Sequence, residues 1–301
     1  MDYKMFFNHP IRYALAVAQQ KGCLSKLNDK AYCSLVMFSR TGVWPNYKQP
    51  KRFNEKMQWL KIYYRRPELT KLVDKCTSRE VVADLVGDKY VIPIIGRWDN
   101  ADKIDLDNLP GQFVLKCNHD GGVIVCRDKR NFNLAEAKAK LAARMKVNYY
   151  DHAREWPYKN ITPCIFAEPL ISDGDKENLP VYKFLCFSGE PKIIQTIQND
   201  KTSYETIDYF DLDWNLLKLN QNYSNSEHPF ERPELLSEMI SVARKLCQGY
   251  PFIRIDLYQA DGKVLFSEFT LFSDAGFEAF HPDDWDKKLG DWITLPEPYT
   301  E

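Results

Sequence analysis

The chain of 301 residues is long enough for one or two domains, and it can bury a core without disulfides or structural metals. Hydrophobic residues make up 44% of it and charged residues 28%, which excludes a disordered or fibrous protein. Its 41 Lys and Arg nearly balance its 42 Asp and Glu. The resulting net charge of −1 argues against a nucleic-acid-coating protein, which would carry a basic excess.

The first 70 residues predict a helical segment. Apolar residues recur at helical spacing over residues 12–24 and 30–42, and Gly22 and Gly42 lie near the plausible ends of these two helices. A turn-rich stretch then leads into residues 53–65, which favour a third helix. No Gly-rich phosphate loop interrupts this part of the sequence.

The middle of the chain mixes helices and strands. Residues 77–87 predict a helix with Thr77 as its N-cap, and residues 90–96 predict a short strand. Two runs rich in β-branched residues flank His119–Gly122, which is the pattern of a β-hairpin.

Strands dominate the remainder, after a strong helical pattern over residues 133–150. The strands and the one further helix are expected, in chain order, at 164–171, 181–189, 191–198 and 206–212 (strands), 234–250 (helix), and 252–258 and 264–272 (strands). The fold class that this order predicts is α+β, helix-led and then sheet-rich.

The cysteines and the hydropathy pattern indicate a cytoplasmic protein. Eight cysteines are scattered without a C-x-x-C pair, and several lie in apolar runs, so we expect buried free thiols in a reducing cytosol. The N-terminus shows no basic leader followed by an apolar run, and no stretch approaches the ~20 apolar residues that cross a bilayer. We therefore predict no signal peptide and no membrane span.

An acidic pair with an arginine is the sharpest chemical signal. Asp256 and Glu268 lie on two predicted strands joined by a turn over residues 259–263, which would bring the two carboxylates together. Arg254 precedes Asp256 by two residues and would share its sheet face. Mg²⁺ prefers one or two carboxylates plus phosphate oxygens, so the pair predicts a magnesium site. A plain ion pair on a solvated sheet face is the alternative.

Three lysines beside apolar residues form the second signal. Lys116 lies inside an apolar strand, where a cation is costly to bury without an anionic partner. Lys75 and Lys183 likewise lie beside apolar residues. The turn His119–Gly122 that follows Lys116 could approach phosphates with its backbone, but taken alone it is better explained as an ordinary hairpin turn. Together with the acidic pair, the lysines suggest a site for a triphosphate and magnesium.

Other chemistries find little support. The five histidines form no zinc motif, no G-x-S-x-G elbow occurs, and neither G-x-G-x-x-G nor a Walker loop is present. Trp59, Trp156 and the pair Tyr149–Tyr150 favour core or interface positions over a sugar platform.

The motifs taken in order resemble the TupA-like ATP-grasp family, which is associated with bacterial surface polysaccharide and teichuronopeptide biosynthesis. The resemblance covers residues 50–292 and keeps the order FNEKMQWLKIYYRRPELTKLVDK, GQFVLKCNHDGG, REWPYK, FAEPLI, VYKFLCFSGEPK, FIRIDLY and FSEFTLFSDAGF.

The resemblance implies an ATP-grasp fold in which two α+β subdomains grip MgATP. It implies a helical segment over residues 1–70, an N-terminal subdomain with the phosphate-covering hairpin over 71–170, and a C-terminal subdomain with the magnesium site over 171–301.

Site residues follow from the resemblance by position. Lys75 and Lys116 resemble the lysines that reach the phosphates or the base, and the turn with His119, Gly121 and Gly122 resembles the hairpin over the triphosphate. The run Glu168-Pro169-Leu170 resembles the hinge that reads the adenine edge, and Asp173 or Asp175 is expected at the ribose hydroxyls.

The resemblance also implies which residues bind the metal and the transferred phosphoryl group. Asp256 and Glu268 resemble the magnesium carboxylates, with Thr270 as a third ligand where many ATP-grasp ligases have Asn. Arg254 resembles the arginine that stabilises the transferred phosphoryl group, and we expect Lys116 and Lys183 to act with it. Val181 stands where the family's D-Y-K pattern has an acidic residue.

The expected function is an ATP-dependent carboxylate–amine ligase that works through an acylphosphate in capsule or surface-polysaccharide assembly. An amino acid or amine would be joined to a carboxylate such as a uronic acid. The alternatives are an ATP-grasp kinase acting on a sugar or glycan, a glycosyltransferase of the same pathway, and a non-catalytic scaffold. Arg79, Arg154 and Lys159 could bind an anionic acceptor, but we favour solvated surface positions for them.

Overall fold

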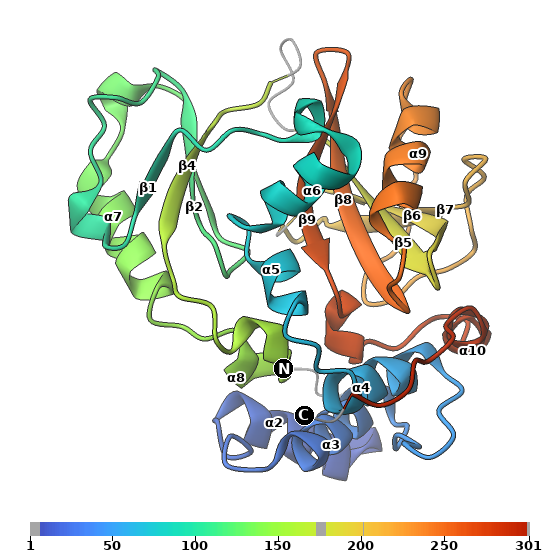
Figure 1. Cartoon of the computed structure of the whole chain (residues 1–301). Coiled ribbons are helices and arrows are strands. Elements are labelled where there is room, and N and C mark those ends of the chain that lie inside the picture. Colours follow the sequence, from blue (N-terminus) through green and yellow to red (C-terminus); the bar gives the residue numbers. More distant parts are fainter. Residues whose placement is uncertain (1–6, 173–178, 201, 300–301) are drawn as a thin grey trace.

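Two sheets in separate lobes, with a helical base below them, organise the protein (Figure 1). The computed structural model describes residues 7–172, 179–200 and 202–299. Within these residues the smaller sheet has four strands in the order β1-β4-β2-β3, and all of its pairs are antiparallel. These strands are β1 (Gly96–Trp98), β2 (Phe113–Cys117), β3 (Val123–Cys126) and β4 (Ile165–Pro169).

The larger sheet has five antiparallel strands in the order β7-β6-β5-β8-β9 within the same described ranges. Antiparallel neighbours need only short turns, and β8 and β9 are joined by the two residues Asp261 and Gly262, both with positive φ. The strands are β5 (Val181–Phe187), β6 (Glu190–Gln198), β7 (Thr206–Phe210), β8 (Phe252–Ala260) and β9 (Lys263–Thr270).

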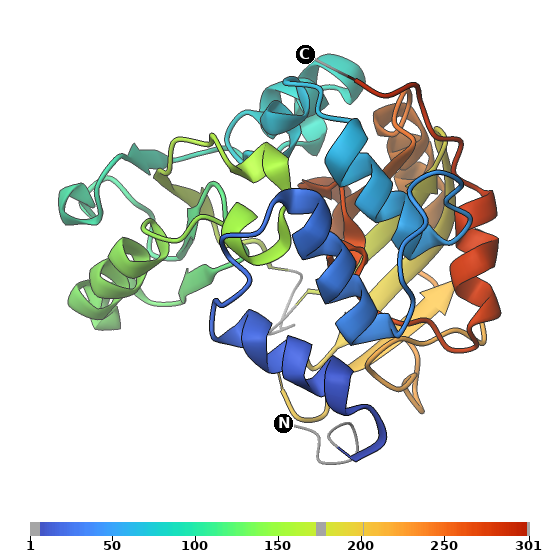
Figure 2. The ribbon, with the colours of Figure 1, turned by 90° about the horizontal axis from the view of Figure 1, so that it is seen from below.

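Helices surround these sheets and gather at one end of the molecule (Figure 2). The base contains α2 (Pro10–Gln20), α3 (Asp29–Thr41) and α4 (Phe53–Tyr63). Asn28 caps α3 by accepting a hydrogen bond from the Ala31 amide, and Gly42 ends it with φ 79°. The other helices are α5 (Leu69–Val73), α6 (Ser78–Val86), α7 (Leu134–Arg144), α8 (Tyr150–Ala153), α9 (Leu236–Leu246) and α10 (Asp284–Asp291).

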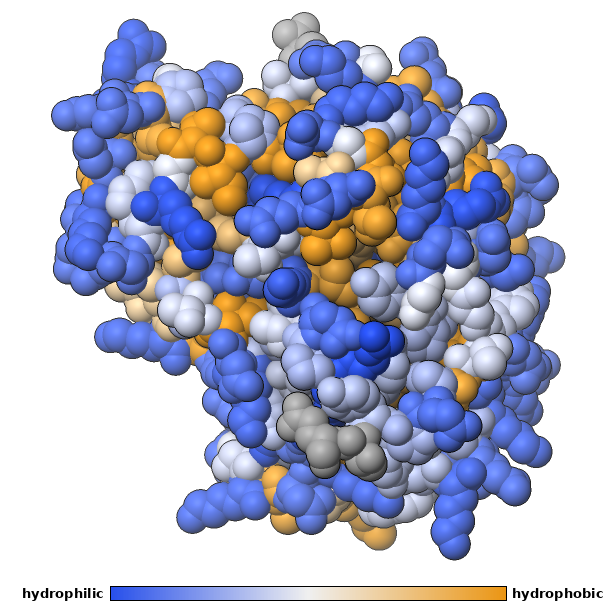
Figure 3. Space-filling view, in the orientation of Figure 1, coloured by the Kyte–Doolittle hydropathy of each residue, from blue (hydrophilic) through white to orange (hydrophobic). Residues whose placement is uncertain are grey.

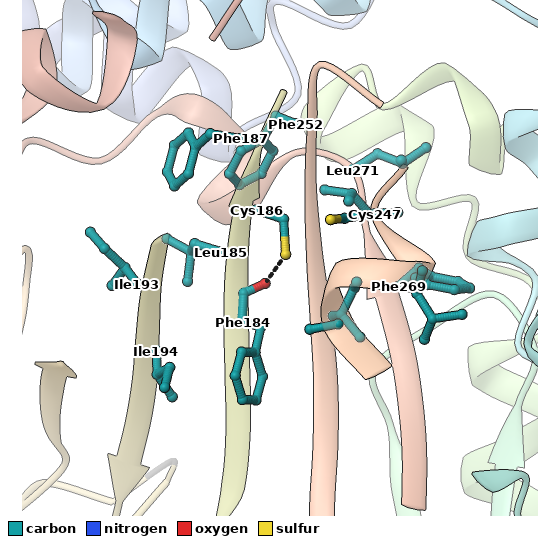
Figure 4. Close-up of a cluster of buried hydrophobic side chains, with 14 of the residues drawn as sticks. Phe184, Leu185, Cys186, Phe187, Ile193, Ile194, Cys247, Phe252, Phe269 and Leu271 are labelled. Atoms are coloured by element: carbon teal, nitrogen blue, oxygen red, sulfur yellow. Dashed lines mark hydrogen bonds between the residues drawn. The ribbon is translucent and has the colours of Figure 1, made fainter. Parts of the chain in front are cut away.

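Alternation along the central strands gives the larger sheet two different faces. Phe184 and Cys186 of β5 point to the face that α9 covers, and the Cys186 thiol donates to the Phe184 carbonyl over 3.5 Å (Figure 4). The opposite face is apolar at one end, where Phe187 and Phe252 pack against Phe53 of α4. Further along, the same face turns polar, and this change positions the site described below.

Helix α10 fastens the chain's C-terminal part to the start of α4. The Asp286 carboxylate accepts from the Asn54 amide over 3.0 Å, and the Lys56 ammonium donates to the carbonyls of Gly290 and Ile293, each over 2.8 Å. Gly290 permits this close approach, because a Cβ there would lie 2.0 Å from the backbone oxygen of Lys51.

Several local expectations need correction. The strand predicted over 90–96 is wrong: Val91 makes one isolated bridge to Phe266, and β1 begins at Gly96 because Pro93 cannot donate to a sheet ladder. The predicted helix over 133–150 is two helices, α7 and α8. Thr77 precedes α6, but its hydroxyl donates to the Lys71 carbonyl instead of capping the helix.

The cysteine prediction is confirmed. All eight cysteines lie within the described residues, all are free thiols, and all except Cys23 are buried. Among the described residues, no helix combines the length and apolar character needed to span a bilayer.

Gly290→Ala should lower the free energy of unfolding by roughly 1–3 kcal/mol, because the added methyl group has no room against the backbone of α4. Urea unfolding measured by circular dichroism checks this. Gly111→Ala is the matched control, since Gly111 is exposed and nothing lies within 4 Å of an added Cβ. Equal stability of the two variants would contradict the assigned packing of α10 on α4.

Candidate active site

Three charged residues on neighbouring strands form a row across the larger sheet. Asp256 of β8 pairs in register with Lys183 of β5 on one side and with Glu268 of β9 on the other. Directly opposed residues of antiparallel strands present their side chains on the same face, so the three lie side by side. The predicted approach of Asp256 and Glu268 is therefore what the structure shows.

Arg254 and Lys75 balance the two carboxylates. The Arg254 guanidinium binds Asp256 through two hydrogen bonds of 2.8 and 2.9 Å, and it lies 3.7 Å from Glu268. The Lys75 ammonium lies 2.6 Å from the other oxygen of Glu268. Burial alone would raise the pKa of Glu268, but Lys75 and Arg254 together lower it to about 2.

Asn118 holds Lys75 in place from the smaller sheet. The Lys75 amide donates to the Asn118 carbonyl over 2.9 Å, and the Asn118 side chain donates to Asp74 and to the Thr162 carbonyl. Asn118 is fully buried, and its side-chain oxygen also accepts from the Cys164 amide. One amide therefore joins the segment that carries Lys75 to the end of β2 and the start of β4.

Side-chain contacts hold the turn between β2 and β3 in place. Asp120 accepts from the Gly122 amide over 2.9 Å and binds Arg144 of α7 over 2.8 Å. The ring of His119 is buried, and its Nε2 lies 3.1 Å from the Val147 carbonyl. Gly121 has no atom within 4 Å of an added Cβ, so its backbone is open to the cavity that it lines.

These groups meet at a cavity of about 190 Å³, here called the first cavity. It brings together six of the predicted residues, with Glu268, Arg254 and Thr270 from the larger sheet and Lys75, His119 and Gly121 from the other side. Gly122 follows at the hairpin turn, and Asp256 is buried beneath Arg254. The remaining lining residues are Asp120, Tyr149, Glu155, Tyr158, Phe272, Asp274 and Ala275.

A second cavity of about 200 Å³ lies against the smaller sheet and is mostly apolar. Glu168, Leu170 and Lys116 line it together with Ile92, Val114, Val123, Val125, Arg127, Pro169, Ile171, Leu179 and Tyr258. The face of the molecule shown in Figure 3 has apolar surface between its two lobes. An apolar slot with a few fixed polar groups is the usual form of a site for a flat ring.

Glu168 is buried between two cations in this second cavity. Lys116 lies 2.6 Å from one of its oxygens, and Arg79 of α6 binds the other. Burial and the charges of Arg79 and Lys75 lower the pKa of Lys116 to about 8, against the opposing pull of Glu268. Lys116 lines the second cavity, and His119, three residues further along the chain, lines the first.

One predicted site residue, Lys183, lines a different cavity. Lys183 is next to Asp256 on the sheet, but it lines a third cavity with Leu179 and Ile197 and is not part of the first cavity. Burial, followed by the charge of Arg254, lowers the pKa of Lys183. Asp173 and Asp175 lie outside the described residues.

The expectation that Arg79 and Arg154 are surface charges is wrong. Arg79 is buried with its guanidinium over the Phe166 ring, and Arg154 is buried between the Tyr32 and Tyr150 rings. Each arginine has polar partners, Glu168 for Arg79 and the Ser25 carbonyl for Arg154. Lys159 is exposed, as expected.

The sequence analysis missed four residues of the first cavity that have polar side chains, besides the apolar Phe272 and Ala275. Glu155 is buried, Tyr149 and Tyr158 have ring centroids 5.0 Å apart, and Asp274 lies in a turn with φ 49°. Glu155, Tyr158 and Asp274 lie in the motifs REWPYK and FSEFTLFSDAGF, for which the sequence predicted no role at these residues, and Tyr149 was predicted at a core or interface position. Trp59 is buried as predicted, whereas Tyr149 is 39% exposed.

The donor set fits a magnesium ion that shares its ligands with a phosphate chain. Asp256, Glu268 and Thr270 supply two carboxylates and a hydroxyl on adjacent strands, and Mg²⁺ typically takes one or two carboxylates plus substrate oxygens. Among the described residues no cluster of three or more His, Cys, Asp and Glu side chains could hold a metal without such help.

Two α+β lobes around a cleft of lysines, an arginine and paired carboxylates have the arrangement expected of an ATP-grasp protein. A sequence profile of the TupA-like ATP-grasp family matches residues 55–294, so the chain belongs to this family. The predicted family and α+β ATP-grasp fold are thereby confirmed, and the assignment supports the predicted class of enzyme, an ATP-grasp ligase. No curated protein matches the chain.

Solved structures with similar folds are distant from this chain. The D-alanine–D-alanine ligase from Helicobacter pylori is 14% identical over 81% of this chain and 70% of its own, with a TM-score of 0.43. The Bacillus anthracis ligase complexed with ATP is 15% identical over 72% of this chain, with a TM-score of 0.39, and the alignment spans 55% of that ligase. The ATP-grasp ligase PsnB complexed with a precursor variant, Mg and ADP is 11% identical over 90% and 66%, with a TM-score of 0.36.

Acid should weaken the wild-type protein more than Glu268→Gln. With a pKa of about 2 in the folded state, below the ordinary carboxyl value, Glu268 contributes stability above the unfolded pKa and loses it as the pH falls. Urea unfolding at pH 7, 5 and 3 should therefore show a smaller loss for Glu268→Gln. The exposed Glu231→Gln should follow the wild type. Parallel losses for all three proteins would refute the Lys75–Glu268 ion pair.

Proposed function

We propose that this chain is an ATP- and Mg²⁺-dependent carboxylate–amine ligase. The observation that carries the proposal is the cross-strand pair Asp256 and Glu268, held beside Arg254 and Lys75 at one cavity. Lys75, Arg254 and Glu268 line this cavity and Asp256 lies beneath Arg254, and such charges of both signs suit a phosphate chain and its metal better than they suit a neutral ligand. The family assignment supports the same class of enzyme.

The roles we propose divide the site into nucleotide, phosphate and metal parts. Glu168 and Leu170, with Lys116, would hold the base in the second cavity, and Asp175 is proposed for the ribose. Lys75, His119, Gly121 and Gly122 would bind the phosphates, and Asp256, Glu268 and Thr270 would hold Mg²⁺. The proposed subdomains 71–170 and 171–301 would each supply one side, in keeping with the position of one sheet in each range.

In the mechanism we propose, a substrate carboxylate oxygen attacks the γ-phosphorus of ATP, and ADP leaves with the broken P–O bond's electrons. Arg254 lies where it can bind the transferred phosphoryl group, and Lys75 and Lys183 add positive charge nearby. Bound Mg²⁺ would neutralise charge on the phosphate oxygens. An amine nitrogen then attacks the acyl carbon, inorganic phosphate leaves, and an amide bond forms with loss of a proton.

The setting we propose is capsule or surface-polysaccharide assembly in the cytoplasm, with an amino acid or amine and a carboxylate-bearing sugar such as a uronic acid as substrates. This setting comes from the family resemblance. A kinase acting on a sugar or glycan is the second candidate, because the same phosphate-binding groups would serve it.

Magnesium-dependent ATP binding should weaken at least about tenfold in Asp256→Asn, because the variant loses a carboxylate ligand and leaves Arg254 without its partner. Titration calorimetry with and without Mg²⁺ measures the effect. The control is Asp213→Asn, an exposed change between β7 and α9 that should leave binding unchanged. Folded wild-type protein that binds no ATP would refute both the ligase and the kinase.

ADP release should require a carboxylate and an amine together. Amino acids and uronic acids are screened in pairs, and hydroxylamine serves as a substitute nucleophile that traps an acylphosphate as a hydroxamate. A stable phosphorylated sugar with no need for an amine would identify the kinase. Turnover of a sugar nucleotide without ATP would identify a glycosyltransferase instead.

A further inference from the structure

The first cavity has two chemically different ends. One end carries Lys75, Arg254 and the hairpin turn, which are groups that attract anions. The other end is acidic and aromatic, with Glu155, Asp274, Tyr149, Tyr158 and Phe272. The phosphate and metal roles proposed above use the first end and leave the second without an assignment.

Glu155 is the unusual group of the second end. It is only 3% exposed, yet it lines the cavity, and within the described residues its carboxylate forms no hydrogen bond and no ion pair within 4.0 Å. Burying a carboxylate without a partner is costly, so the arrangement leaves room for a cation. The buried Lys61 does not meet this need, because its ammonium donates to the carbonyls of Ala153 and Ala275 instead.

Aromatic rings complete the surroundings that a cation prefers. Tyr149 and Tyr158 lie with ring centroids 5.0 Å apart and planes inclined at 51°, and both line the cavity with Glu155. Phe272 lies on the opposite side, after β9. Ring faces attract ammonium groups, most strongly where water is excluded. The Glu155 carboxylate is the largest influence that raises the pKa of Tyr149, which indicates that the two groups lie close together.

We infer that this second end, formed by Glu155, Asp274, Tyr149 and Tyr158, binds the protonated amino group of the acceptor substrate. The inference rests on the proposed ligase function, because it assigns that reaction's amine to a place beside the transferred phosphoryl group. Arg254 lines the same cavity as both Glu155 and Glu268. Once the ammonium has given up one proton to solvent, the amine held there would be next to the acyl carbon that it attacks.

The pH dependence of binding follows from the groups around Glu155. Burial raises the pKa of Glu155 to about 7, opposed by Lys61 of α4 and Arg254 of β8 and assisted by Asp274 after β9. Tyr149 and Tyr158 face the same carboxylate and remain neutral, because burial and Glu155 raise their pKa values. Cation binding should accordingly be stronger at pH 7, where a substantial part of Glu155 is charged, than at pH 5, where it is protonated; an α-amine stays mostly protonated at both.

The experiment compares glycinamide, which is protonated near neutral pH, with the uncharged N-acetylglycinamide. Both are titrated to millimolar concentration against the full chain by saturation-transfer NMR and calorimetry, with ATP binding measured on the same samples. Glycinamide should bind, N-acetylglycinamide should not, and Glu155→Gln should weaken glycinamide binding at least about tenfold without changing ATP affinity. Glu231→Gln is the matched control and should behave as the wild type.

Equal binding of the two amides, or unchanged glycinamide affinity in Glu155→Gln, would overturn the inference. If Glu155→Gln does not fold, Asp274→Asn replaces it, since Asn tolerates the positive φ of 49° at this turn and removes the second charge. Protein that binds ATP but not glycinamide would refute the ammonium site alone. Protein that binds glycinamide but not ATP would refute the ligase and leave the ammonium site standing.

Discussion

The cost of burying charge is the constraint on which this site depends. The carboxylates of Asp256 and Glu168 are buried and that of Glu268 is partly buried, and each is paired with Arg254, Lys75, Lys116 or Arg79. Removing one partner of such a pair leaves an uncompensated buried charge, which is far more costly than the pair itself is stabilising. The pairs therefore act as a preformed framework, in which phosphate oxygens and a cation can replace the protein's own counter-charges without large rearrangement.

Lys75 is the point at which the two sides of the cleft depend on each other. Its backbone is fixed by Asn118 at the end of β2, while its ammonium reaches Glu268 on β9 of the other sheet. If Glu268 held a cation, Lys75 would lose its carboxylate partner and could bind the phosphates instead. Lys75 could make this exchange without leaving its place, so one side chain would link nucleotide binding to both sides of the cleft.

The sequence allowed prediction of features that depend on short-range periodicity. Alternation in FIRIDLY placed Arg254 and Asp256 on one face, and a two-residue turn brought Glu268 opposite Asp256. The acidic and aromatic end of the cavity could not be predicted in this way. Glu155 follows a short helix and Asp274 lies in a left-handed turn, where no period assigns a face. Arg79 was misassigned because its partner, Glu168, lies 89 residues away and only the tertiary fold reveals it.

Buried contacts join the helical base to the acidic and aromatic end of the cavity. Lys61 of α4 donates to the carbonyls of Ala153 and Ala275, which stand beside Glu155 and Asp274. Tyr32 of α3 donates to the His152 carbonyl over 2.7 Å, and Arg154 reaches back to the Ser25 carbonyl. Helices α2 and α3, which precede the region matched by the family profile, thus support the loop that carries Glu155. The end of the cavity proposed for the phosphates thus depends mainly on the two sheets, whereas the position of the Glu155 carboxylate depends on helices outside them.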